Sequence, residues 1–81
     1  MDSLIRVRVI LHSYLREKFP PEAGGRGEVA LPPGSSLGEL ITTLALPETI
    51  HAAVNGQITR DRRTVLNDGD EVRFFHAGAG G

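Results

Sequence analysis

Alternation of hydrophobic and polar positions marks the segment Ile5–Leu11, with Ile10 as the one exception. Its odd-numbered residues are aliphatic, whereas positions 6 and 8 are arginines. A period of two predicts a half-buried strand whose arginines face away from the core. Shorter hydrophobic runs predict further strands at Glu28–Leu31, His51–Val54, Gln57–Thr59 and Glu71–His76.

One amphipathic helix is predicted between the second and third strands. Ser36 and Glu39 have the spacing of a capping box, in which each side chain accepts a backbone N–H of the first turn. Apolar residues then follow at helical spacing, namely Leu37, Leu40, Ile41 and Leu44. Pro47 is expected to end this helix. The mixed segment Ser13–Phe19 predicts another turn or two of helix, ended by Pro20–Pro21.

Turn residues separate these elements. Asn55–Gly56 is the strongest signal for a two-residue hairpin, because both positions tolerate positive φ. Asn67–Asp70 also predicts a turn. The polar Arg60–Arg63 and the glycine-rich Glu22–Gly27 are expected to be loops, and Thr64–Leu66 is expected to return to the core.

The order of elements is strand, strand, helix, then three strands, which indicates an α+β fold. A mixed sheet of four to five strands with one main helix on one face buries both hydrophobic surfaces economically. That arrangement is the β-grasp, or ubiquitin-like, architecture. We expect a β-grasp domain at residues 1–76 and a flexible Gly/Ala tail at residues 77–81.

Composition narrows the possible functions. Eighty-one residues allow one small core and leave no room for a separate nucleotide-binding domain. A net charge of −1 does not favour bulk binding to nucleic acid or membranes. The absence of cysteine excludes disulfides, thiolate nucleophiles and cysteine metal sites. With no secretory signal pattern and no long apolar run, the expected location is the cytoplasm.

Few side chains offer chemistry. His12, His51 and His76 are too far apart in sequence for a short metal-ligand motif, so no metal or general-base role is expected. Gly24–Gly27 lacks the Lys-Ser/Thr of a phosphate-binding loop. Arg60, Arg62 and Arg63 are interpreted mainly as a solvated loop balanced by Asp61, with an electrostatic contact as the alternative.

The last residues are more informative. Ala77–Gly81 contains only glycine and alanine and ends in Gly80–Gly81. Residues without bulky side chains can thread through a narrow channel and deliver the α-carboxylate of Gly81 to another protein's active site. A free carboxylate is a poor acyl donor and needs activation, most simply by adenylation with ATP. Because this chain has no nucleotide site of its own, the activating enzyme is expected to be a partner.

The chain resembles the MoaD/ThiS family of ubiquitin-like sulfur carriers. The resembling segments span nearly the whole chain and are Leu31–Leu40, Ala53–Gly56, Leu66–Val72 and Gly80–Gly81. The resemblance implies a β-grasp fold and a non-enzymatic co-substrate. It also implies adenylation of the Gly81 carboxylate by a ubiquitin-activating-enzyme-like partner of the MoeB/ThiF type, followed by conversion to a thiocarboxylate.

Two branches of that family are open. Tyr14–Glu17 and Asp68–Phe75 resemble the small subunit of molybdopterin synthase, whereas the short link from Leu46 to His51 and the Gly/Ala end resemble the thiamine sulfur carrier. The implied sulfur acceptor is therefore a molybdopterin synthase large subunit or a thiazole synthase. The chain itself is expected to bind no cofactor.

A docking surface is expected beside the tail. If Val72 and Phe74 face the helix, Phe75 is left outside, and the first strand should run next to it. Phe75 near Ile10, rimmed by arginines, is then a candidate partner-binding patch. The full set of predicted partner-binding residues is Phe75, Ile10, Arg8, Arg73, His76, Ala77, Gly78 and Ala79, with His12 as a further neighbour.

Two other function classes remain open at this point. A ubiquitin-like modifier would use the same Gly80–Gly81 end but would form an isopeptide bond to a lysine of another protein. A non-catalytic β-grasp binding module would use the Arg60, Arg62 and Arg63 cluster, against which the low net basicity argues.

Overall fold

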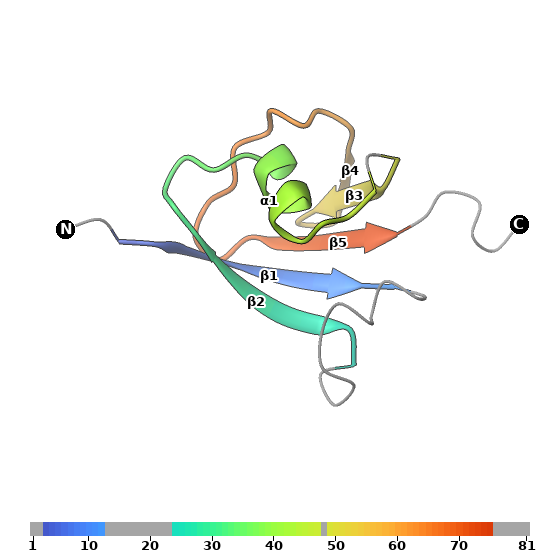
Figure 1. Ribbon diagram of the computed structural model, residues 1–81, viewed down its shortest axis with the longest axis horizontal. Helices are drawn as coiled ribbons and strands as arrows, with labels where there is room; N and C mark the ends of the chain where they lie inside the picture. Colours follow the sequence, from blue (N-terminus) through green and yellow to red (C-terminus); the bar gives the residue numbers. More distant parts are fainter. Residues whose placement is uncertain (1–2, 13–23, 48, 76–81) are drawn as a thin grey trace, which may run out of the picture.

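A five-stranded mixed sheet with one helix on one face forms the fold (Figure 1). The computed structural model describes residues 3–12, 24–47 and 49–75. The elements are β1 (Ile5–Leu11), β2 (Arg26–Leu31), α1 (Leu37–Thr43), β3 (His51–Val54), β4 (Gln57–Thr59) and β5 (Glu71–Phe75). No helix among these described segments is long and apolar enough to cross a membrane.

The strand order is β2-β1-β5-β3-β4, which places the first and last strands side by side. β1 and β5 are parallel, so their arrowheads lie at the same end of the sheet (Figure 1). The other neighbouring pairs are antiparallel. Sequence analysis predicted this adjacency, and the pairing confirms it.

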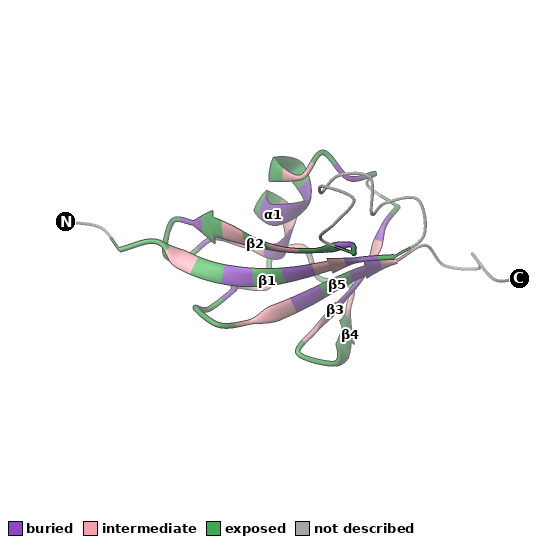
Figure 2. Cartoon of the chain, turned by 90° about the horizontal axis from the view of Figure 1, so that it is seen from below, coloured by how far each residue is buried: buried purple, intermediate pink, exposed green. Residues whose placement is uncertain are grey.

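The core lies between α1 and the sheet. Buried positions alternate with exposed or half-buried ones along β1 (Figure 2). Val72 and Phe74 of β5 are fully buried, which confirms that they face the helix. The hydrophobic cluster comprises Val7, Val9, Leu11, Leu31, Leu37, Leu40, Ile41, Leu46, Ile50, Ala52, Leu66, Val72 and Phe74.

The helix begins as predicted but ends earlier than expected. Ser36 caps it and its hydroxyl accepts the N–H of Glu39 at 3.2 Å. The helix ends at Thr43 rather than at Pro47, because Ala45 adopts a φ of +55°. The N–H groups of Ala45 and Leu46 then bond back to the carbonyls of Thr42 and Ile41, both at 3.0 Å, as in a Schellman ending.

One strand boundary also differs from expectation, and another lies at the edge of the described residues. β2 begins at Arg26, whereas the sequence pattern placed Arg26 and Gly27 in a loop. Pairing with β1 extends the strand, and Leu11 N–H donates to the Gly25 carbonyl at 2.7 Å. The described part of β5 ends at Phe75, and the helix expected at Ser13–Phe19 lies outside the described residues.

The Asn55–Gly56 hairpin is confirmed and does more than reverse the chain. Asn55 and Gly56 have φ values of +50° and +87°. The Asn55 amide donates to Asp70 at 2.9 Å, and its carbonyl oxygen accepts the Glu71 N–H at 2.9 Å. This single side chain therefore joins the β3–β4 hairpin to the start of β5.

Candidate functional site

The sheet face opposite α1 carries no helix in the described part of the chain (Figure 1). The register aligns residues of neighbouring strands in rows across that face. Ile10 lies beside Arg73, Arg73 beside Ala53, and Ala53 beside Ile58. Ile10 is half-buried, whereas Ile58 is 66% exposed. The row therefore offers apolar surface at Ile10 and Ile58, with Arg73 between them and Arg26 of β2 beside Ile10.

Phe75 lies one row closer to the end of the sheet. Its neighbour on β3 is His51, and their rings are stacked with centroids 5.8 Å apart. Phe75 is on the outer face as expected but is half-buried instead of exposed, and Ile10 lies one row away, beside Arg73. The β3–β5 register supplies His51 as a cover that the sequence pattern did not reveal.

The other end of this row is His12, which directly follows β1. His12 is exposed and its N–H donates to the Phe74 carbonyl at 3.3 Å, which keeps it alongside β5. His12 therefore lies near Phe75, as expected. Phe75 is also the last described residue before the carboxyl terminus.

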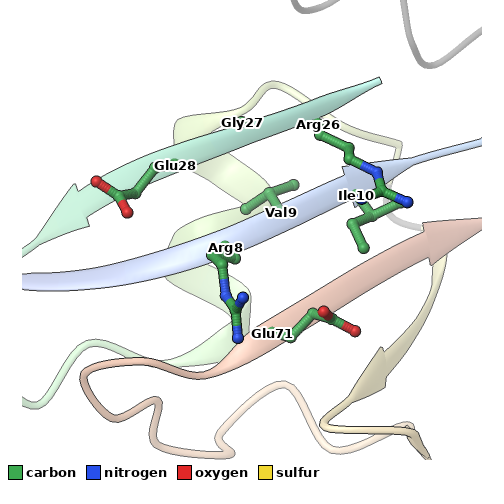
Figure 3. A pocket seen from close by; sticks show the side chains of 7 residues that line it. All are labelled: Arg8, Val9, Ile10, Arg26, Gly27, Glu28 and Glu71. Carbon is green, nitrogen blue, oxygen red and sulfur yellow. The ribbon is translucent and has the colours of Figure 1, made fainter. Parts of the chain in front are cut away.

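A shallow groove of about 300 Å³ lies on the same face, towards β2 (Figure 3). It runs between β2 and β5 across the middle of β1. The lining residues are Arg8, Val9, Ile10, Arg26, Gly27, Glu28 and Glu71. Arg8 and Ile10 were predicted to bind a partner, whereas the sequence analysis did not single out Arg26.

Two ion pairs flank this groove. Arg6 contacts Glu28 at 3.3 Å, and Arg73 contacts Glu71 at 3.2 Å. Both pairs are partly exposed to solvent, so each contributes little to stability. The carboxylates of Glu28 and Glu71 are therefore paired with Arg6 and Arg73, and not with the two arginines that line the groove.

The arginine loop at Arg60–Arg63 has a mainly structural role. Arg62 donates to the Ile50 carbonyl at 2.9 Å, and its own carbonyl accepts the Gly38 N–H at 2.9 Å. Arg63 pairs with Asp61 at 3.3 Å. Hydrogen bonds from the backbone and then the side chain of Arg63 lower the pKa of Asp61 below its usual value. Arg62 and Arg63 are thus engaged in contacts within the described residues.

No group of three or more His, Asp or Glu side chains that could hold a metal lies within residues 3–12, 24–47 and 49–75. Several predicted site residues fall outside these ranges. They are His76, Ala77, Gly78, Ala79, Gly80 and Gly81. Their assigned roles stay predictions, as does the boundary between a domain at 1–76 and a tail at 77–81.

Comparison with protein families gives one match. The model of the ThiS family matches residues 14–81, which include the terminal Gly80–Gly81. No curated protein matches the chain significantly.

Comparison with solved structures gives several matches of the same fold. A putative molybdopterin converting factor subunit 1 from Pyrococcus furiosus is 23% identical, with a TM-score of 0.73 over 89% of this chain and 97% of that one. The small archaeal modifier protein 1 of H. volcanii is 16% identical, with a TM-score of 0.72 over 89% and 97%. A Caldiarchaeum Subterraneum ubiquitin is 15% identical, with a TM-score of 0.61 over 98% and 100%. These likenesses confirm the predicted β-grasp fold.

Proposed function

From the fact that the chain belongs to the ThiS family, we propose that it is a sulfur carrier that works through the carboxylate of Gly81. The observation that carries the proposal is the extent of the family match, which continues to the final Gly80–Gly81. In this proposal the chain is a protein co-substrate, and a MoeB/ThiF-type adenylating enzyme and a sulfur-accepting enzyme are its partners.

The proposed chemistry has two steps. An oxygen of the Gly81 carboxylate attacks the α-phosphorus of ATP held by the partner, which forms an acyl adenylate and releases pyrophosphate. Sulfur at the oxidation level of sulfide then attacks the carbonyl carbon. AMP leaves with one of the original carboxylate oxygens, and the product is a thiocarboxylate. The chain itself supplies only the acyl group and binds no cofactor.

A thiocarboxylate suits a carrier for a physical reason. Sulfur in this position is a soft nucleophile, yet it stays covalently attached and does not diffuse away as free sulfide. The absence of cysteine fits this use, since the carrier needs no side-chain thiol. The sulfur would pass to an acceptor of the molybdopterin synthase large-subunit type or of the thiazole synthase type.

The geometry of the described residues supports a division between handle and reactive end. Phe75 ends the described part of β5, and the six residues 76–81 that follow can span at most about 20 Å. A partner that grips the row of His12, Phe75 and His51 would therefore need its adenylating centre within that reach. Ala53 and Ile58 extend the apolar part of the handle across β3 and β4.

The proposal is tested by incubating the chain with a MoeB/ThiF-type adenylating enzyme, ATP and a sulfide source, and measuring the intact mass. We expect a mass increase equal to the difference between sulfur and oxygen. A variant without Gly80 and Gly81 should keep the thermal stability of the full chain and show no such increase. An unchanged mass of the full chain with every adenylating enzyme of this type would refute the proposal.

A second candidate arises from the names of two structural neighbours, an archaeal modifier protein and a ubiquitin. The same acyl adenylate can acylate a lysine amine, which displaces AMP and forms an isopeptide bond. Peptide mass spectrometry of digested cell proteins separates the candidates. Because trypsin cleaves after Arg73, the remnant on a modified lysine would be residues 74–81. Such remnants would support a modifier, whereas a thiocarboxylate pool without them supports a carrier.

A further inference from the structure

Two arginines of the sheet groove have no anionic partner among residues 3–12, 24–47 and 49–75. Figure 3 shows the side chains of Arg8 and Arg26 on the two neighbouring strands, with Ile10 between them. Neither guanidinium makes an ion pair or hydrogen bond to a side chain of the described residues, in contrast to Arg6 and Arg73. Both arginines are exposed, and Ile10 is half-buried.

The carboxylates that line the groove are already engaged. Glu71 accepts from Arg73 at 3.2 Å, and Glu28 accepts from Arg6 at 3.3 Å. Both glutamates lie beside Arg8 in the strand registers, so they offset part of the positive charge of the groove, but no ion pair joins them to Arg8 or Arg26. Four arginines share this face with two glutamates, although the whole chain has a net charge of −1. The face is thus the basic side of a slightly acidic protein.

This charge distribution constrains what can cover the groove. Burying an unpaired guanidinium under an apolar surface is costly, because the charge loses its hydration without a replacement partner. A partner with carboxylates at the two arginines and an apolar contact at Ile10 avoids that cost. Guanidinium groups also bind carboxylates with favourable paired geometry.

We propose that the groove between Arg8 and Arg26 receives an acidic segment of the enzyme that activates Gly81. This inference rests on the proposed function, since that enzyme is the partner the carrier must first find in solution. Opposite charges on the two surfaces accelerate such an encounter and fix its orientation. The stacked pair of Phe75 and His51 would then add the apolar contact nearer the reactive end.

The test uses an adenylating enzyme that has been shown to form the thiocarboxylate on the wild-type chain. Its association rate is measured by surface plasmon resonance with wild type, Arg8→Gln, Arg26→Gln and the double variant. We expect each single change to slow association about threefold at low ionic strength, and the double change about tenfold. High salt should bring the rates together, because screening removes long-range attraction.

The matched control is the double variant Arg60→Gln/Arg63→Gln, which removes the same charge from the loop that contacts α1. Its association rate should stay within about twofold of wild type. Equal slowing by the control would mean that net charge, not the groove, matters. An unchanged association rate of Arg8→Gln/Arg26→Gln with the adenylating enzyme would also overturn the inference, even if the same variant bound the sulfur acceptor more slowly. If no enzyme charges the wild-type chain, the proposed function itself fails first.

Discussion

The rings of His51 and Phe75 lie stacked across the β3–β5 pair, with centroids 5.8 Å apart and an interplanar angle of 23°. Both side chains are half-buried on the face opposite α1. The stack therefore forms a flat, partly apolar surface at the end of the sheet. Such surfaces are typical of the few residues that dominate a protein interface.

We expect Phe75→Ala to leave the fold intact and to weaken binding to the activating enzyme at least about tenfold. The Phe75 ring lies on the sheet face opposite α1, so its removal leaves the core around Phe74 intact. Isothermal titration calorimetry measures the affinity, and thermal unfolding checks the fold. His51→Ala removes the other ring of the stack and should weaken binding less. Wild-type affinity for Phe75→Ala would remove this patch from the docking surface.

The Asn55 side chain provides a test of how the turns hold the sheet together. Asn55→Gly keeps the positive φ but loses the bonds to Asp70 and to the Glu71 N–H. We expect the free energy of unfolding to fall by about 1–3 kcal/mol, because two hydrogen bonds are lost and the new glycine raises the conformational entropy of the unfolded chain. Urea denaturation measures the change. Gln57→Gly, in the neighbouring strand, is the comparison variant, because it introduces a glycine without removing the Asn55 hydrogen bonds.

Replacing a buried side chain by alanine should lower the stability of the domain far more than replacing an exposed one. Phe74 is 0% exposed and Val65 is 55% exposed. Phe74→Ala should cost about 3–5 kcal/mol, because it leaves a cavity beneath α1. Val65→Ala should change stability by no more than about 0.5 kcal/mol. Chemical denaturation gives both values, and Phe74→Leu provides a milder change if the alanine variant does not fold.

The Asp61–Arg63 contact predicts a small pH dependence of stability. The pKa of Asp61 is lowered by the Arg63 hydrogen bonds, so its carboxylate form stabilises the folded state. That stabilisation is complete above the unfolded pKa of about 3.9 and is lost as the pH falls through the lower folded pKa. Asp61→Asn should therefore lower the melting temperature at neutral pH. The difference from wild type should shrink as the pH falls below the unfolded pKa and through the lower folded pKa, and a difference that grows with acidity would contradict this account.

The sequence alone was sufficient for the local elements. The alternation in Ile5–Leu11, the Ser36 cap and the Asn55–Gly56 turn each depend on residues close in sequence, and all three are confirmed. The same holds for the inward positions Val72 and Phe74. Local steric and hydrogen-bonding preferences depend on residues close in sequence, so these elements can be predicted without tertiary information.

Element ends and neighbours on the open face needed the tertiary structure. β2 gains Arg26 and Gly27 because β1 offers partners for them, and α1 stops early because Ala45 turns the chain into the core. His51 covers Phe75 only because β3 pairs with β5 in one particular register. The same registers place Arg8 between Glu28 and Glu71, yet those carboxylates form their ion pairs with Arg6 and Arg73. Contacts between residues distant in sequence depend on how strands align, and no local pattern specifies that alignment.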